Sequence, residues 1–205
     1  PDAQALPGDV DLVVASPGWP PDAPLLVQAA RREVELWGEV ELAWRLRGPD
    51  AAPWLVVTGT NGKTTTTRLL AQLGRALGRP CGVIGTLGAT LGEEVGEAGN
   101  TTPDPVSLQK QLCEWRDQGV FAVAMEVSSH ALDLHRVDAC WIDVSVFTNL
   151  TQDHLDYHKN METYWACKKK LFTEVLRTGP KKQRAVAVIN RDDPRGDELA
   201  QRQSL

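Results

Sequence analysis

The sequence lacks the features that mark membrane-spanning, secreted and nucleic-acid-binding proteins. No apolar run approaches the roughly 18 residues that a membrane span needs. The N-terminal segment PDAQALPGDV has neither the basic start nor the apolar stretch of a signal peptide. With 22 basic and 27 acidic residues the net charge is −5, which argues against a surface that follows nucleic-acid phosphates. We therefore expect a cytoplasmic protein with no membrane span and no nucleic-acid partner.

Cysteine is also scarce. Cys81, Cys113, Cys140 and Cys167 are scattered along the chain and form no CxxC pair. Zinc sites built from four cysteines usually contain such closely spaced pairs, so this spacing disfavours one. We expect reduced thiols, most of them buried as small hydrophobic side chains.

What the sequence does contain is material for a sizeable core, with 42% hydrophobic residues in a chain of 205. Apolar runs of strand length occur at 11–15, 54–58, 82–85, 121–127, 143–148 and 185–189. Helical patterns lie between them at 25–32, 64–77, 105–118 and 161–177. Runs such as AVAM and VAVI are continuously apolar, which is typical of parallel strands buried on both faces. The predicted fold class is α/β, with a doubly wound, mostly parallel sheet.

A domain boundary is expected at 47–53, where RGPDAAP is short and rich in turn-forming residues. Residues 1–48 then form part of a smaller α/β domain, with a strand, an SPG turn, a helix, a strand and a helix. Residues 54–205 form the larger domain, and INRDDPRGDELAQRQSL begins one more crossover helix at its end.

The sharpest motif is VVTGTNGKTTTTRLL at 56–70. A strand, a tight turn and a helix follow one another, and in this order backbone N–H groups and a helix N-terminus form an anion site. Gly59 and Gly62 let the backbone approach a phosphate, Lys63 supplies a positive charge, and Thr64 can give its hydroxyl to Mg²⁺. The pattern is an imperfect Walker motif, because Val57 replaces its first glycine. A glycine-rich turn without a ligand is the alternative. The predicted nucleotide-binding residues are Gly59, Thr60, Asn61, Gly62, Lys63, Thr64 and Thr65.

Polar residues follow two further predicted strands, and strand ends line the ligand crevice of an open α/β sheet. In AVAMEVSSH, Glu126 is a natural Mg²⁺ ligand, with a helix cap or a surface charge as the alternative. In FTNLTQDHLDYH, His154 could bind a second metal ion through a neutral imidazole nitrogen. His158 is interpreted as a structural hydrogen-bonding group.

A run of three lysines lies in YWACKKKLF, within a predicted helix. Lys169 and Lys170 are expected to be solvated. Lys168 shares a helix face with Tyr164 and Phe172, which indicates a different environment. A buried lysine can lose its proton and then react with carbon dioxide.

Five segments in order, GTNGKTTTT, NTTPDP, MEVSSHAL, FTNLTQDHLDYH and ACKKKLF, resemble the Mur ligases. These are ATP-dependent amide-forming enzymes of bacterial peptidoglycan precursor synthesis. The resemblance covers roughly 54–193, the central ATPase domain of the family. From about residue 82 onward, the sequence most resembles the branch of the family that adds the third residue, diaminopimelate or lysine, to UDP-N-acetylmuramoyl-L-alanyl-D-glutamate. Residues 9–46 instead resemble the branch that adds D-glutamate to UDP-N-acetylmuramoyl-L-alanine, so the chain reads as a mosaic of two ligases.

The resemblance implies a role for each matched residue. Lys63 and Thr64 would serve ATP and Mg²⁺, and the metal ligands would be Thr64, Glu126, His154 and Lys168, the last as a carbamate. Lys63, His154 and Lys168 would be the catalytic residues. The UDP-N-acetylmuramoyl peptide would contact Gly18, Asn100, Thr101, Thr102, Ser128 and Arg136. Leu134 stands where the third-residue branch usually carries glutamine, so one polar contact with the substrate is missing.

The implied reaction is phosphoryl transfer to a substrate carboxylate, followed by attack of an amine on the acyl phosphate. The family's C-terminal domain, which binds the incoming amino acid, is not among these residues, and a monomer is expected. Three alternatives remain: the D-glutamate-adding ligase, an ATP- or UDP-sugar-binding module without turnover, and another P-loop enzyme. A GTPase is disfavoured because no NKxD-like segment is present, and folylpolyglutamate synthase is disfavoured by NTTPD and EVSSHAL.

Overall fold

The computed structural model describes residues 5–8, 10–15, 22–38, 53–92, 94–95, 99–138 and 140–203. The chain divides into two compact units, residues 1–49 and 50–205. The division falls within the turn-rich segment 47–53, of which only Pro53 is described.

In the described part of the first unit, a helix joins two parallel strands. β1 (Leu12–Ala15) pairs with β2 (Glu35–Gly38), and Leu12 lies opposite Glu35. α1 (Pro24–Arg31) supplies the crossover that a parallel pair requires, and proline suits its first turn because no N–H is needed there. Gly18, in the SPG turn, lies outside the described residues, so its predicted contact with substrate stays a prediction.

The second unit is built on a twisted sheet whose described strands run in the order β6-β5-β4-β7-β3-β8-β9. They are β3 (Trp54–Thr58), β4 (Cys81–Gly85), β5 (Gly88–Leu91), β6 (Glu94–Val95), β7 (Ala122–Glu126), β8 (Val144–Phe147) and β9 (Val186–Ile189). β4, β7, β3, β8 and β9 are parallel, and β5 and β6 are antiparallel at one edge. The predicted α/β fold with a mostly parallel sheet is confirmed, whereas the hairpin of β5 and β6 was not predicted.

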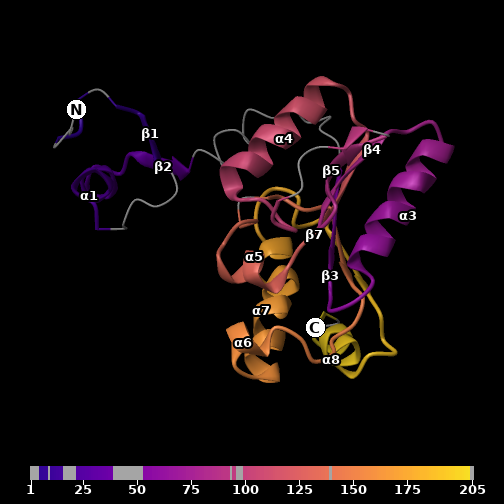
Figure 1. Cartoon of the computed structure of the whole chain (residues 1–205). Coiled ribbons are helices and arrows are strands. Elements are labelled where there is room, and N and C mark those ends of the chain that lie inside the picture. The colour runs from indigo at the N-terminus through magenta and orange to yellow at the C-terminus, as the bar shows by residue number, and fades with distance from the viewer. Residues whose placement is uncertain are drawn as a thin grey trace. The chain divides into compact units, whose positions relative to one another are not determined.

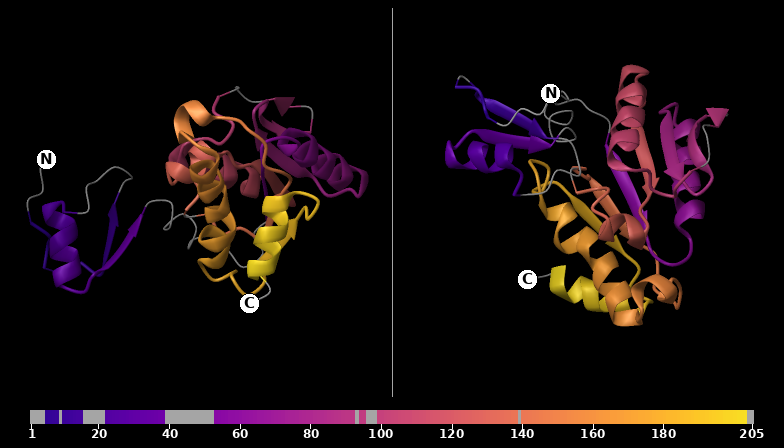
Figure 2. Two further views of the ribbon diagram at one scale, coloured as in Figure 1. Left: turned by 90° about the horizontal axis from the view of Figure 1, so that it is seen from below. Right: turned by 60° about the vertical axis from the view of Figure 1, so that its left-hand side comes forward.

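Helices cover both faces of this sheet. Figure 1 shows α3 (Lys63–Ala76) on one face, and α4 (Pro105–Asp117), α5 (Ser129–Asp133) and α7 (Met161–Thr173) on the other. Figure 2 gives the same layering from two further directions. The remaining helices of the described part are α6 (Leu155–His158), the 3-10 turn η1 (Val175–Arg177) and α8 (Pro194–Gln203). The helix predicted at 161–177 ends at Thr173 and is followed by η1.

Local sequence explains where the long helices begin. Asp104 caps α4, because its carboxylate accepts hydrogen bonds from the backbone N–H groups of Val106 and Ser107. Asn160 caps α7 by accepting from the N–H of Thr163. α3 differs, since it follows Gly62 and has no side-chain cap. The N–H groups of its first turn are therefore not taken by a capping side chain.

The core agrees with the predicted pattern in the central strands but not in β9. All residues of β4 and β7 are buried, as expected of strands covered on both faces. In β9, however, Val186 and Val188 are about half exposed, so the prediction of a fully buried strand from VAVI was wrong. β9 is the last strand in the described sheet, and alternate side chains face outward. The cysteine prediction is confirmed: all four are free, and Cys81, Cys140 and Cys167 are buried.

The contact between β4 and α4 yields a stability prediction. A methyl group on Gly82 of β4 would overlap the indole ring of Trp115, which is buried. Overpacking a core commonly costs about 1–3 kcal/mol, so we expect Gly82→Ala to lower the free energy of unfolding by about that amount in urea denaturation. Gly99→Ala is the control, because nothing lies within 4 Å of its added methyl group. Equal losses in the two variants would contradict the packing described here.

Candidate functional site

The glycine-rich loop and Glu126, both singled out in the sequence, lie where β3 and β7 end, beside the end of β8. These strands are neighbours, with Val57 opposite Glu126 and Thr58 opposite Phe147. The segment 59–62 leads from the end of β3 into α3 (Figure 1). Ligands of open α/β sheets bind beyond the carboxyl ends of the strands, so the glycine-rich loop lies at the centre of the expected binding edge.

The loop needs its two glycines and is held by residues that follow β8. Gly59 and Gly62 have φ of +148° and +84°, which few other residues adopt, and a methyl group on Gly59 would overlap the hydroxyl of Thr148. The Asn149 side chain accepts from the N–H of Asn61 at 2.9 Å, and Thr148 Oγ1 donates to the carbonyl of Asn61 at 2.6 Å. Thr148 and Asn149 lie within FTNLTQDH, but neither was assigned a role from the sequence.

This geometry suits an anion. α3 starts directly after the loop without a side-chain cap. The first N–H groups of a helix carry partial positive charge and bind phosphate well. The arrangement predicted from the strand, turn and helix order is therefore present, although Val57 makes the Walker motif incomplete.

Two lysine ammonium groups meet at the carbonyl oxygen of Gly59. Lys63 Nζ donates to the carbonyl oxygens of Gly59 and Thr60, both at 3.0 Å, and Lys168 Nζ donates to that of Gly59 at 2.8 Å. Burial lowers the pKa of Lys63, while the charges of Glu126 and Asp153 oppose that change.

Lys168 occupies the distinct environment predicted for it, since only 1% of its surface is exposed. Burial, with the nearby charge of Lys63 as a further cause, lowers the pKa of Lys168 to about 7. Its ammonium nitrogen lies 4.7 Å from the centre of the Tyr164 ring. A lysine with this pKa is largely neutral at slightly basic pH and is able to act as a nucleophile.

The other two lysines of the run are not fully solvated, contrary to the prediction. The side chain of Lys169 is 24% exposed and lies 3.8 Å from a carboxylate oxygen of Glu198 in α8. The side chain of Lys170 is 32% exposed and lies 3.8 Å from Asp133. Packing of α7 against α5 and α8 leaves these side chains partly covered.

Glu126 ends β7 with a buried carboxylate that three donors hold. Thr64 Oγ1 donates to Oε1 at 2.9 Å. The N–H of Thr86 donates to Oε1 at 3.1 Å, and the hydroxyl of Thr86 donates to Oε2 at 3.2 Å. A methyl group on Gly85 would overlap this carboxylate, so the glycine provides the space for it. With 1% of its surface exposed, Glu126 is not the surface charge considered as an alternative.

The predicted metal ligands are brought together only in part. Thr64 and Glu126 offer hard oxygen atoms that suit Mg²⁺. His154 is partly exposed, has φ of +52° and lies 3.5 Å from Asp153. Within the described ranges, no hydrogen bond joins His154 to Glu126 or Lys168, and no group of three or more His, Cys, Asp or Glu side chains is arranged to hold a metal ion.

Three histidines gather with two tyrosines beside this edge. His158 is 3% exposed and its Nε2 lies 2.9 Å from the hydroxyl of Ser129, which confirms its structural role. His130 was missed by the sequence analysis, although it stands in the quoted segment MEVSSHAL. Its ring centre lies 5.0 Å from that of His154 and 4.1 Å from that of Tyr157. Burial, and secondarily the nearby His154, lower the pKa of His130.

The residues expected to hold the muramoyl peptide form a connected group around Thr102. Its hydroxyl donates to the carbonyl of Glu126 at 2.9 Å and accepts from the N–H of Ser128 at 3.1 Å. Arg136 donates to the carbonyl of Thr102 at 2.8 Å, and the hydroxyls of Thr101 and Thr86 are 3.1 Å apart. Thr102 has no exposed surface, so its side chain supports its neighbours in this structure.

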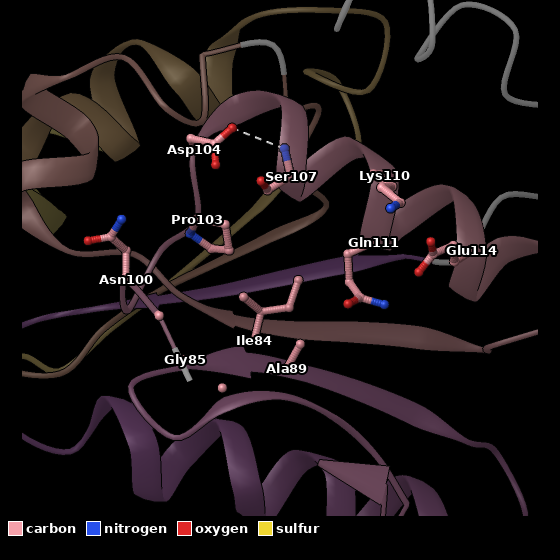
Figure 3. Close-up of a pocket in the computed structure, with 12 residues that line it drawn as sticks. Ile84, Gly85, Ala89, Asn100, Pro103, Asp104, Ser107, Lys110, Gln111 and Glu114 are labelled. Atoms are coloured by element: carbon pink, nitrogen blue, oxygen red, sulfur yellow. Dashed lines mark hydrogen bonds between the residues drawn. The ribbon is translucent and has the colours of Figure 1, made fainter. Parts of the chain in front are cut away.

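Asn100 lies apart from that group, in a groove of about 500 Å³ between α4 and the strands β4 and β5. Figure 3 shows Asn100 and Pro103 toward one end, Gln111 and Glu114 toward the other, and Ile84 on the strand side. Gly85 also lines this groove and borders the Glu126 carboxylate.

Residues 57–204 match the model of the Mur ligase middle domain, and the chain therefore belongs to the Mur ligase family. It is 50% identical over 151 residues to the UDP-N-acetylmuramoyl-L-alanyl-D-glutamate–2,6-diaminopimelate ligase of Geobacter metallireducens, covering 74% of this chain and 30% of the relative. It is 45% identical over 207 residues to the ligase of the same name from Xanthomonas campestris pv. campestris, covering 96% and 39%. The chain thus spans about a third of the length of these relatives.

The solved structures agree on the fold. A structure of a ligase with the same name superimposes with a TM-score of 0.64 at 29% identity, covering 93% of this chain and 42% of that one. A bifunctional folylpolyglutamate synthase/dihydrofolate synthase with bound Mn, AMPPNP and L-glutamate reaches a TM-score of 0.55 at 20% identity, a likeness of fold alone. It covers 80% of this chain and 45% of that one.

The N-terminal segment can be explained without a second type of ligase. Because the Xanthomonas match covers 96% of the chain, it includes most of the segment that resembles the D-glutamate-adding branch. The Xanthomonas ligase alone thus matches both units, so two different ligases are not needed to explain the sequence.

Within the part of the chain that the structure describes, no helix combines the length and the apolar character of a membrane span.

The lowered pKa of Lys168 predicts how stability changes with pH. Between about pH 7 and the ordinary lysine pKa of about 10.4, the unfolded chain holds the proton and the folded chain does not. The free energy of unfolding therefore rises with pH in this window and loses this contribution as pH falls toward 7. Relative to Lys168→Met, we expect the parent to gain about 2 kcal/mol between pH 7 and 9, measured by denaturation in buffers free of carbon dioxide.

Lys169→Met is the matched control, since that lysine is not fully buried. Its difference from the parent should stay nearly constant over the same range. If Lys168→Met also ran parallel to the parent, Lys168 would be protonated at pH 9 in the folded chain.

Proposed function

We propose that this chain carries the ATP-binding part of a ligase that adds an amino acid to UDP-N-acetylmuramoyl-L-alanyl-D-glutamate through an acyl phosphate. The observation that carries this proposal is the meeting of an uncapped helix start, Lys63 and the Thr64–Glu126 pair at one strand edge. The names of relatives 45–50% identical to the chain support diaminopimelate as the amino acid. We also propose that the enzyme is bacterial, lies in the cytoplasm and is a monomer.

The loop from Gly59 to Thr65 would bind the triphosphate. Backbone N–H groups at the start of α3 would donate to phosphate oxygens. Lys63 lies folded across the loop on the carbonyls of Gly59 and Thr60, and a triphosphate would draw its ammonium group outward onto the β- and γ-oxygens. The site thus places positive charge where negative charge develops during transfer of the γ-phosphate.

Thr64 and Glu126 would hold Mg²⁺, and their hard, partly buried oxygen atoms fit that ion. Magnesium, when bound, supplies charge that neutralises the triphosphate oxygens. His154, on the loop after β8, would be a further ligand through a neutral imidazole nitrogen. Beside the reacting groups, His154 would orient the substrate carboxylate. Lys63 would stabilise the transferred phosphoryl group.

Lys168 would act as a carbamate. Its neutral amine attacks carbon dioxide, a nitrogen–carbon bond forms, and one proton is released to solvent, leaving an anionic group on the lysine. The low pKa and the burial of this amine support the reaction. The change places an anion beside the Lys63 ammonium group, which creates an attraction, and it gives a carboxylate-like ligand for a metal ion.

The UDP-muramoyl peptide would lie along the segment 100–102 and the start of α5. Asn100, Thr101, Ser128 and Arg136 offer amide, hydroxyl and guanidinium groups there. The structure favours an indirect contribution from Thr102, which supports Ser128 and Arg136. The carboxylate of the peptide would then attack the γ-phosphate in line, and the amine of the added amino acid would displace phosphate from the acyl phosphate.

Nucleotide binding by the chain itself tests the first part of this proposal. Calorimetric titration of AMPPNP in millimolar Mg²⁺ should show saturable binding by the parent. Lys63→Met should weaken it at least tenfold, because charge-assisted bonds to phosphate are lost. Lys110→Met, on α4, is the control and should bind as the parent does. No binding by the parent would refute the proposal.

Turnover separates a ligase from a binding module. In a full-length ligase that contains this chain, phosphate release should require ATP, UDP-N-acetylmuramoyl-L-alanyl-D-glutamate and diaminopimelate together. UDP-N-acetylmuramoyl-L-alanine with D-glutamate should not replace the last two. Saturable nucleotide binding without phosphate release would favour the binding module. Release with the shorter substrate and D-glutamate would favour the alternative ligase.

Carbamate formation on Lys168 has a direct spectroscopic readout. With ¹³C-labelled bicarbonate at pH 8, the parent should give a carbamate carbon resonance that is absent from Lys168→Met and retained in Lys169→Met. The signal should weaken as pH falls below about 7, where Lys168 becomes protonated. A resonance that survives in Lys168→Met would assign the modification to another amine.

A further inference from the structure

Among the described residues that donate to the Glu126 carboxylate, Thr86 makes the most hydrogen bonds, with two against one from Thr64. It directly follows β4, the strand beside β7, at the same edge of the sheet. Its N–H donates to Oε1 at 3.1 Å and its hydroxyl donates to Oε2 at 3.2 Å. Thr86 therefore holds both oxygens of the carboxylate, whereas Thr64 holds Oε1 alone.

Two donors from one residue fix the rotation of a carboxylate group. The Glu126 side chain is buried, and Gly85 leaves the space into which it turns. Hydrogen bonds to an ionised group in such surroundings are stronger than those between neutral groups. With Thr86 on both oxygens, the Oε1 atom is directed at the Thr64 hydroxyl.

The same hydroxyl also connects the carboxylate to the segment 100–102. The hydroxyls of Thr86 and Thr101 are 3.1 Å apart. A hydroxyl has one proton to donate and two lone pairs to accept with. Because Thr86 gives its proton to Glu126, it accepts one from Thr101. The result is a continuous chain of donors, from Thr101 through Thr86 to Glu126, which Thr64 joins from the other side.

We propose that Thr86 is a positioning residue for the divalent-cation site: it holds Glu126 in the orientation in which its carboxylate and the Thr64 hydroxyl face one ion. This inference rests on the proposed function, since it assumes that nucleotide binds with a divalent cation. Thr86 itself need not touch the ion. Its loss should therefore weaken the contribution of the cation and spare nucleotide binding without cation.

Calorimetry of AMPPNP binding, with excess EDTA and then with saturating Mn²⁺, measures the two contributions separately. Thr86→Val keeps the shape of the side chain and removes the hydroxyl. In EDTA, we expect the AMPPNP affinity of this variant to lie within twofold of that of the parent. The gain in affinity that Mn²⁺ produces should be about tenfold smaller in the variant than in the parent. Thr86→Ser should restore that affinity. Thr90→Val, in β5 of the same hairpin, is the matched control and should behave as the parent.

The outcomes separate this inference from the proposed function. If the parent fails to bind AMPPNP under both conditions, the proposed function falls and this inference falls with it. If the parent gains affinity from Mn²⁺ and Thr86→Val gains as much, the proposed function stands and the role of Thr86 is wrong. If Thr86→Val also loses the affinity measured in EDTA, Thr86 supports the loop generally and the inference is again wrong.

Discussion

The candidate site depends on one backbone oxygen, the carbonyl of Gly59, which accepts hydrogen bonds from two lysines. Lys63 comes from the start of α3 and Lys168 from the middle of α7, so the carbonyl joins two helices that lie far apart in the sequence. Two ammonium groups on one acceptor in a buried place repel each other. The repulsion adds to the burial of Lys168 and favours its neutral form. The neutral form is also the one that carbamylation requires.

The phosphate loop is held from outside as much as by its own sequence. Thr148, Asn149 and Thr151, all after β8, bond to the loop through backbone and side-chain groups. Thr60 is joined to Thr151 in both directions, by its hydroxyl and by the N–H of Thr151. The loop that follows β8 therefore has two tasks, since it both supports the loop after β3 and carries His154 to the edge of the sheet. These contacts fix the loop in place although Val57 departs from the Walker pattern.

Much of the fold could be predicted because continuous apolar runs and helix-capping residues carry their signals locally. β3, β4, β7 and α4 begin and end within a residue or two of the predicted positions. β5 and β6 escaped prediction because their few residues, including Gly88 and Thr90, form no apolar run. In the site, the order of strand, turn and helix identified Lys63 and Thr64. Glu126 was identifiable at the end of an apolar strand, and Lys168 because it shares a helix face with Tyr164. Thr86 and His130 were not, because their partners are Glu126 and His154, which lie 40 and 24 residues away.

The absence of a side chain at Gly85 is linked to the length of the acid at position 126. The missing side chain of Gly85 leaves the space that the Glu126 carboxylate fills. An alanine at 85 would place a methyl group in the volume of this carboxylate, so the acid would have to turn away from Thr64 or be shortened. The space left by this one glycine therefore limits how long an acid the crevice accommodates at position 126.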